Sequence, residues 1–188
     1  MDILKAIKKR RSVRGYLNKK IPKQVLDRVL EAARLAPTAA NKQPFKLILV
    51  TDKSTKAKLV EASRKQTFIA EAPIVVVGCA FPEESYQNIG GTHTSEEIDI
   101  SIVFDHLMLQ AAEEGLGICW IGAFDEEQVK AILNIPSNVK VVGLTPLGYP
   151  SRNEFKPGKH MQRKPISEII LYESTSVKKL NLEGGIKQ

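Results

Sequence analysis

The sequence predicts an α/β (α+β) layered sandwich, in which a central mixed β-sheet is flanked by helices. Segments rich in strand-forming residues alternate with segments of helical apolar spacing as far as about residue 147, which is typical of layered domains. The chain has 188 residues and is 43% hydrophobic, so one domain of this size can bury a self-sufficient core. With 26% charged residues besides, the composition is near the average of globular proteins, which excludes a wholly disordered chain.

The N-terminal half is expected to hold three helices and two strands. Apolar residues at helical spacing predict helices over 2–10, over 22–37 and over 54–64, the second beginning at Pro22 and ending at Pro37. Strand-forming residues predict a strand over 45–50. The continuous apolar run at 73–79 is typical of a strand covered on both faces.

The middle of the chain is expected to hold a polar segment and then a very apolar helix. Residues 83–93 are interpreted as a loop or lid with Gly90-Gly91 at its hinge. Thr94 and Glu97 form a predicted capping box for a helix that ends near Glu114. Apolar residues point in most directions around this helix, so we expect it at the centre of the core or at a subunit interface.

The C-terminal part completes the predicted sheet. The expected elements are a helix capped by Asp125 that ends near Asn134, and strands over 118–122, 139–147 and 169–172. We expect one domain over residues 1–172. The tail at 173–188 is long enough to wrap around a partner subunit.

Familiar catalytic and metal-binding motifs are missing from the sequence. It has no GxGxxG, no GxxxxGK[ST] and no GxSxG. His93, His106 and His160 have no partner at metal-ligand spacing. Cys79 and Cys119 lie in apolar strand-like runs, and we expect both to be buried free thiols.

Localisation and partner class follow from hydropathy and charge. No apolar run approaches the roughly 18 residues of a membrane span, and the N-terminus lacks a signal-peptide pattern, so we expect a cytoplasmic protein with no membrane partner. Residues 1–65 carry 18 Lys+Arg against 5 Asp+Glu, whereas 66–129 carry 12 acids and no Lys or Arg. Because aromatics are few (6%) and positive charge gathers at two distant segments, 8–14 and 152–164, the charge pattern favours a compact anionic ligand over nucleic acid.

Four segments stand out as candidates for ligand binding. Arg10–Arg14 offers three guanidinium groups and the hydroxyl of Ser12, which match phosphate oxygens. The other three are the two-proline loop 36–45, the small-residue strand end 120–124, and Gly148-Tyr149-Pro150 with the later Arg163. Taken alone, each segment also has an ordinary structural explanation. In the same order, these are a solvated surface, an ordinary loop, a core strand that runs into a turn, and a plain turn with a surface arginine.

In this order and combination, the four segments resemble the FMN-dependent nitroreductase family (NADH oxidase/flavin reductase-like). The family's opening Arg-x-Ser-x-Arg/Lys matches Arg10–Arg14, and its Pro-Ser-x-x-Asn-x-Gln-Pro-Trp loop matches Pro37–Phe45. Its buried helix and following strand match Leu109–Gly122, and its closing motif matches Gly148–Pro150 with Arg163. Thr38 keeps the hydroxyl of the usual Ser, whereas Ala40 and Phe45 stand where Gly and Trp are common. The resemblance covers about residues 1–172.

The resemblance implies a homodimer that exchanges its C-terminal segment and binds FMN at the subunit interface. One subunit would hold the phosphate, ribityl chain and pyrimidine edge with Arg10, Arg11, Ser12, Arg14 and Arg163. The other subunit would cover the dimethylbenzene side with Pro37, Thr38, Ala39 and Asn41. Gln66 is expected near the pyrimidine edge, and the backbone N–H groups of Gly122 and Ala123 near the flavin N5.

The activity implied by the resemblance is FMN-dependent oxidoreduction. NADH or NADPH would donate electrons, and a small-molecule acceptor such as a nitroaromatic, a quinone or a flavin would take them in a ping-pong reaction. The flavin carries the chemistry, so no catalytic side chain and no metal are expected. Tyr86 is the candidate substrate contact, unless its segment is simply a mobile surface loop. The alternatives are another flavin enzyme on this fold (ene-reducing or flavin-consuming) and a non-enzymatic binder of FMN or nucleic acid.

Overall fold

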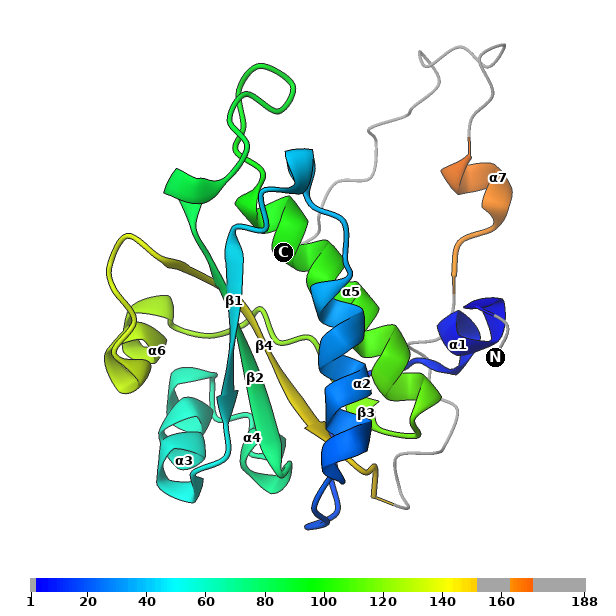
Figure 1. Cartoon of the computed structure of the whole chain (residues 1–188). Coiled ribbons are helices and arrows are strands. Elements are labelled where there is room, and N and C mark those ends of the chain that lie inside the picture. Colours follow the sequence, from blue (N-terminus) through cyan, green and yellow to red (C-terminus); the bar gives the residue numbers. More distant parts are fainter. Residues whose placement is uncertain (1–2, 152–162, 171–188) are drawn as a thin grey trace. The chain divides into compact units, whose positions relative to one another are not determined.

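A four-stranded sheet with the order β1-β2-β4-β3 forms the centre of the first of two units, residues 1–156. The computed structural model describes residues 3–151 and, in the second unit (157–188), residues 163–170 (Figure 1). The strands are β1 (Phe45–Val50), β2 (Ile74–Ala80), β3 (Gly117–Ile118) and β4 (Lys140–Gly148). The helices of the first unit are α1 (Ile3–Lys9), α2 (Lys23–Arg34), α3 (Lys53–Ala62), α4 (Phe68–Glu71), α5 (Glu96–Glu113) and α6 (Glu126–Leu133), with short 3-10 turns at Ala39–Asn41 and Pro82–Glu84.

All ladders between these strands are antiparallel, so the predicted mixed sheet is wrong for the described strands. Two parallel strands are usually joined by one crossover helix, which carries the chain back to the end of the sheet where the first strand began. Here two helices, α3 and α4, lie between β1 and β2. The chain therefore re-enters the sheet where it left, and Val50 at the end of β1 pairs with Val75 near the start of β2. A parallel contact occurs at the β3 edge, as the isolated bridge between Ser12 and Ile118.

Helices cover both faces of the sheet, as the layered prediction required. On one face, α2 and α5 pack over the even-numbered residues of β2, such as Val76. On the other face, α3, α4 and α6 cover odd-numbered residues such as Val75 and Val77 (Figure 1). Every residue of β2 is buried, which confirms the prediction from its continuous apolar run.

Helix α5 is central to the core, as predicted, but one stripe of it is open. Ile100, Val103, Phe104 and Leu107 are fully buried, whereas a stripe on the opposite side is exposed or half-buried and includes Ile98 and Ile102. The helix ends with a Schellman arrangement in which Gly115 adopts φ 72° and Leu116 N donates to Ala111 O. The core interpretation of this helix is therefore confirmed, and its place at a subunit interface stays a prediction.

Several local predictions are wrong. Thr94 does not cap α5: the helix begins after Ser95, and Thr94 Oγ1 donates to Glu96 Oε1 instead. The strand predicted at 118–122 shortens to β3 because Cys119 N donates to the Thr145 hydroxyl rather than to a backbone carbonyl. Ile169 ends helix α7 (Ile166–Ile169) of the second unit rather than starting a strand.

Other predictions are confirmed or stay predictions. Cys79 and Cys119 are buried free thiols, and burial raises the pKa of Cys79 to about 11. Among the described residues, no helix combines the length and apolar composition needed to cross a membrane. The tail predicted at 173–188 and its exchange between subunits lie outside the described residues, so they stay predictions.

Candidate functional site

The basic segment Arg10–Arg14 touches the β3 edge of the sheet through one isolated parallel bridge, between Ser12 and Ile118. Val13 N donates to Ile118 O at 2.8 Å, and Val13 is only 3% exposed. Gly117 permits this approach, because a Cβ there would lie 2.8 Å from a Val13 methyl carbon. Backbone pairing thus fixes the segment, with Ser12 and Arg14 exposed and Arg10 half-buried.

Tyr16 anchors the other end of the basic segment. Its hydroxyl donates to Val13 O at 2.8 Å, and its backbone N–H donates to Glu71 Oε2 at 3.0 Å. Tyr16 itself is buried. The buried Tyr16 therefore fixes the backbone that carries the arginines at the edge of the sheet.

Four residues beyond Ile118, the chain reaches Gly122 and Ala123. Gln66 joins them, because its Nε2 donates to Ala123 O at 3.3 Å and to Ser63 O at 3.0 Å. Among the described residues, the backbone N–H groups of Gly122 and Ala123 have no hydrogen-bond partner. Two adjacent donors are thus available to a ligand beside the predicted Gln66.

Trp120 supplies a flat apolar surface next to these donors. Its ring lies 4.8 Å from that of Phe104 with an interplanar angle of 58°. A Cβ on Gly143 would approach the Trp120 ring to 3.3 Å, so the missing side chain makes room for the indole. Gly143 pairs with Gly78 in the sheet, and a Cβ on Gly78 would overlap Phe104. The two aromatic rings therefore rest on two paired glycines.

The predicted loop Pro37–Asn41 lies at the opposite, N-terminal end of α5. Ala39 N donates to Asp99 Oδ1 at 2.8 Å, and Gln43 N donates to Thr38 Oγ1 at 3.0 Å. Ala40, Asn41 and Gln43 have positive φ of 49°, 54° and 53°. Such strained backbone gathers at functional sites, where the surrounding structure holds it.

The two groups of predicted site residues are therefore far apart within one chain. Helix α5 rises about 21 Å between Asp99, which holds the loop, and Glu113, next to the β3 edge, at 1.5 Å per residue. Figure 1 shows the loop before β1 at one end of α5 and β3 at the other. Arg163 is exposed and belongs to the second unit, so its part in a phosphate site stays a prediction.

The segment predicted as a lid is a hairpin next to the loop. Ile89 and His93 exchange backbone hydrogen bonds of 2.7 and 3.0 Å, and Ser95 N donates to Tyr86 O at 3.0 Å. Gly90 and Gly91 adopt φ 57° and 81° at the tip. They form the turn of the hairpin, so their predicted place at a hinge is wrong. Tyr86 is 43% exposed at the base.

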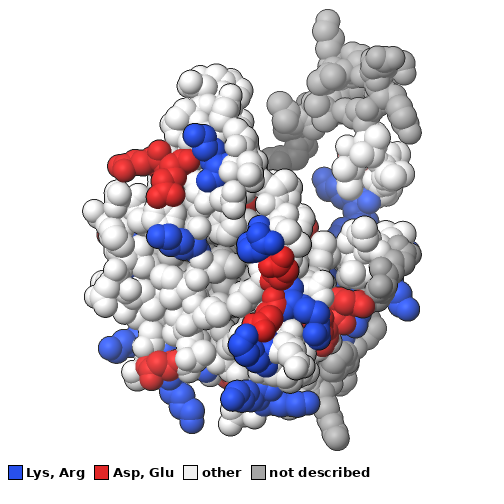
Figure 2. Space-filling model, viewed as in Figure 1, with Lys and Arg blue, Asp and Glu red and all other residues white. Residues whose placement is uncertain are grey.

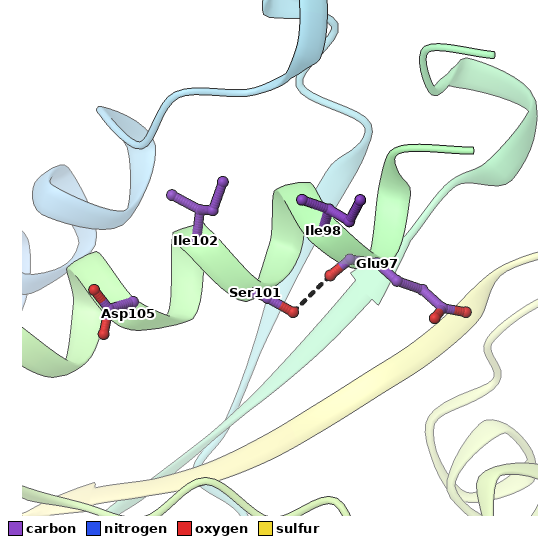
Figure 3. Close-up of a pocket in the computed structure, with 5 residues that line it drawn as sticks. All are labelled: Glu97, Ile98, Ser101, Ile102 and Asp105. Carbon is purple, nitrogen blue, oxygen red and sulfur yellow. Dashed lines mark hydrogen bonds between the residues drawn. The ribbon is translucent and has the colours of Figure 1, made fainter. Parts of the chain in front are cut away.

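An open groove of about 610 Å³ runs along the outer stripe of α5, and its lining is shown in Figure 3. It is lined by Glu97, Ile98, Ser101, Ile102 and Asp105. Figure 3 shows Ile98 and Ile102 projecting to the same side from successive turns. Ile98 is 49% exposed, so the groove combines an unpaired apolar stripe with acidic margins.

An ion pair between the buried Glu96 and the partly exposed Lys140 lies near the start of α5. The carboxylate of Glu96 is 1% exposed and accepts from Lys140 Nζ at 2.8 Å and from Thr94 Oγ1 at 3.0 Å. Burial opposes ionisation, but these hydrogen bonds outweigh it and lower the pKa of Glu96 to about 2. This end of α5 is therefore held by charge as well as by packing.

Acidic and basic side chains alternate along α2 on the face shown in Figure 2. The pairs are Lys23–Asp27 at 2.7 Å, Arg34–Glu31 at 2.6 Å and Arg28–Glu114 at 2.6 Å. Among the side chains described, this face has no continuous basic patch of the kind that binds nucleic acid.

The β3 edge fits FMN on its own chemistry. Cationic side chains on Arg10–Arg14 suit a phosphate, and the unpaired N–H groups of Gly122 and Ala123 suit the acceptor atoms of a flavin ring. Trp120 offers a flat apolar surface beside them. Within the described residues, no cluster of His, Cys, Asp or Glu is arranged to hold a metal ion.

Two further polar residues were not predicted from the sequence. Ser95 and Asp99 are buried at the start of α5 and touch both the hairpin and the loop. The signal was available: a hydroxyl and a carboxylate four residues apart lie on the same side of a helix. Such residues must be paired when they are buried.

The comparison with known sequences supports the same family over most of the chain. The profile described as "Nitroreductase family" matches residues 7–90 and 65–149. A putative NADH dehydrogenase/NAD(P)H nitroreductase from Methanothermobacter thermautotrophicus is 31% identical over 157 residues, covering 81% of this chain and 80% of that protein.

Solved structures give the same result for the fold. A nitroreductase family protein from Clostridium difficile 630 is 34% identical with a TM-score of 0.83, covering 92% of this chain and 99% of that one. An FMN-dependent nitroreductase from Clostridium difficile R20291 is 26% identical with a TM-score of 0.75, covering 90% and 98%. With the profile spanning most of the first unit, the chain belongs to the nitroreductase family of oxidoreductases.

Proposed function

We propose that the protein binds FMN and uses NADH or NADPH to reduce small acceptors such as nitroaromatics, quinones or flavins. One observation carries the proposal: the Arg10–Arg14 segment and the unpaired N–H groups of Gly122 and Ala123 lie along the same edge of the sheet. The edge combines cations for a phosphate with donors for a ring. The names of the related nitroreductases support this cofactor and donor.

The residues at this edge have separate tasks. Bound FMN would supply hydride acceptance and donation. Arg10 or Arg14 would stabilise negative charge that develops at the pyrimidine edge, and Gly122 and Ala123 would donate hydrogen bonds to ring acceptors. Gln66, held by Ser63 O and Ala123 O, would orient the same edge. No side chain needs to act as a nucleophile.

The complete site needs a second copy of the chain. The loop Pro37–Asn41 lies about 21 Å along α5 from the level of the β3 edge, so one chain cannot place both against one flavin. A homodimer with α5 antiparallel to its counterpart would bring the loop of one subunit to the Ser12 edge of the other. The loop would then cover the dimethylbenzene side, as the family resemblance implies.

The groove on α5 supports this arrangement. A two-fold axis near the middle of α5 would pass close to the stripe formed by Ile98, Ser101, Ile102 and Asp105. Burial of the half-exposed Ile98 and its neighbours would then stabilise the dimer. Sedimentation of dilute protein should show a dimer, and a stable monomer loaded with FMN would contradict the shared site.

The cofactor assignment is tested by equilibrium dialysis with FMN. Arg10→Ala and Arg163→Ala should each weaken binding by about 1.5–3 kcal/mol, the value of a charge-assisted hydrogen bond. Arg34→Ala is the matched control, because Arg34 is exposed on α2 and pairs with Glu31. Unchanged affinity in both variants would exclude this phosphate site.

The reaction is tested by anaerobic stopped flow on the FMN-loaded protein. NADH or NADPH should bleach the flavin absorbance, and a quinone or nitroaromatic should restore it with ping-pong kinetics. Tyr86→Ala should slow the acceptor step more than the donor step, since Tyr86 is half-exposed at the base of the hairpin. Restoration by an activated alkene alone would favour an ene-reducing enzyme. A flavin that neither cofactor reduces would favour a non-enzymatic FMN-binding protein.

A further inference from the structure

Two buried polar side chains lie one turn apart where α5 begins. Ser95 is 0% exposed and Asp99 is 2% exposed. Around them stand apolar residues such as Ile100, which is fully buried. A buried carboxylate needs strong hydrogen bonds to remain in such surroundings. The hydrogen-bond partners of Asp99 therefore indicate its role.

The partners belong to two segments that are distant in sequence. Asp99 Oδ1 accepts from Ala39 N at 2.8 Å, and Asp99 Oδ2 accepts from Ser95 Oγ at 2.7 Å. Ser95 Oγ in turn accepts from Tyr86 N at 3.0 Å. A continuous path of hydrogen bonds thus runs from the base of the hairpin through α5 to the strained loop.

Ser95 gives up its ordinary role to make this path. A serine at a helix N-cap usually accepts a hydrogen bond from the helix's own N–H groups, but the Ser95 side chain makes no cap hydrogen bond. By contrast, Asp52 caps α3 by accepting from Thr55 N, and Asp125 caps α6 by accepting from Gln128 N. The hydroxyl of Ser95 is used between segments and not for its own helix.

We propose that Ser95 and Asp99 are positioning residues that hold the loop Thr38–Asn41 and the Tyr86 hairpin in one fixed relation. This rests on the proposed function, in which the loop contacts the flavin and Tyr86 contacts the acceptor. The pair then sets the flavin contact and the acceptor contact together. A carboxylate suits the task because its two oxygens accept from two donors at once, whereas an amide offers one accepting oxygen.

The first test measures the backbone amides themselves, in protein without cofactor. Ser95→Ala removes the acceptor of Tyr86 N, so exchange of the Tyr86 amide should rise about five- to tenfold, the effect of losing one ordinary hydrogen bond. Asp99→Asn keeps the size of the side chain but has one neutral accepting oxygen in place of two anionic ones. The hydrogen bond from Ala39 N is therefore weakened, and exchange of the Ala39 amide should rise by a similar factor. Hydrogen exchange followed by NMR or mass spectrometry gives both rates.

Two controls separate positioning from general loss of stability. Ile100→Val disturbs the same buried turn of α5 without touching either segment, and should raise exchange across the core rather than at Ala39 and Tyr86. Asp27→Asn makes the same chemical change at an exposed site on α2. Unchanged exchange at both amides in Ser95→Ala and Asp99→Asn would overturn the proposal.

The second test measures turnover in the FMN-loaded variants. Ser95→Ala should raise KM for the acceptor about fivefold with kcat changed less than twofold, since Tyr86 is loosened but not removed. Asp99→Asn should in addition weaken FMN binding. Equal loss of kcat in these variants and in Ile100→Val would mean a purely structural role. If the parent protein binds no FMN, the proposed function fails, while the amide rates still decide whether the pair holds both segments.

Discussion

The two ends of α5 are built in different ways. At the C-terminal end, the basic segment Arg10–Arg14 is held by one backbone hydrogen bond to Ile118 and by close packing of Val13 on Gly117. At the N-terminal end, the loop and the hairpin are held by buried side chains, with strained backbone at Ala40 and Asn41. One end depends mainly on apolar packing, and the other depends on a few specific polar contacts.

This difference has a consequence for mobility. The basic segment has one backbone hydrogen bond to β3, but its Val13 and Tyr16 side chains are buried in the core cluster. The loop and the hairpin are instead held to α5 by one or two polar contacts each. The proposed flavin phosphate site therefore lies on the rigid end, and the proposed acceptor site lies on the end that can adjust. Such a division suits a site that keeps its cofactor but exchanges two different substrates.

The largest effect is expected at the rigid end, from Gly117→Ala. The added Cβ would lie within 2.8–2.9 Å of three Val13 side-chain atoms, and valine is stiff and buried here. Overpacking of this kind should cost about 2–3 kcal/mol of unfolding free energy. Urea denaturation measures the loss, and FMN affinity should fall with it because Ser12 and Arg14 shift.

Two further variants test whether the clash between the added Cβ and Val13 causes the loss of stability. Val13→Ala with Gly117→Ala should cost less than the sum of the two single changes, because the contact is shared. Gly115→Ala, which has open space but φ 72°, should cost about 1 kcal/mol for conformation alone. Strict additivity of the double variant would show that Val13 and Gly117 do not hold each other.

At the other end, Lys140→Met should reduce stability in a pH-dependent way. The pKa of Glu96 is lowered to about 2 in the folded protein, so this pair stabilises the fold above the unfolded pKa near 4.5 and loses its effect as pH falls toward 2. Removing Lys140 should cost about 1–2 kcal/mol at pH 7, less than a fully buried pair because Lys140 is partly solvated. The deficit should vanish near pH 2 in urea titrations. A constant deficit from pH 7 to 2 would contradict the ion-pair explanation.

The same contrast explains what the sequence could predict. Periodicity and composition predict α2, β1, β2, β4 and α6 closely, because local apolar spacing is sufficient for these elements. The antiparallel sheet was missed since the direction of β2 depends on how α3 and α4 pack together, which no local pattern records. At 118–122, the predicted strand is interrupted because Cys119 N donates to the side-chain hydroxyl of Thr145.

For the site, ordered motifs were more informative than single residues. They pointed to Gln66, Gly122 and Ala123, which the structure brings together, and to the loop 37–41, which it places at the far end of α5. Ser95 and Asp99 escaped prediction because their roles exist only once the hairpin and the loop have folded against α5. Their partners are 9 residues away for Ser95 and 60 residues away for Asp99.

The smallest effect is expected from Ala40→Gly in the strained loop. Ala40 has φ 49°, a conformation that glycine adopts without cost and that disfavours alanine by about 1–2 kcal/mol. Glycine also loses more freedom on folding, so the net gain in unfolding free energy should be only about 0.5–1 kcal/mol. Thermal unfolding of the variant measures the gain, with Ala39→Gly as its neighbour control, which should lose stability because Ala39 lies outside the positive-φ residues. If Ala40→Gly destabilises the protein instead, contacts of Ala40, and not only the loop's hydrogen bonds to Thr38 and Asp99, stabilise this loop. The difference drawn above between the two ends of α5 would then be smaller.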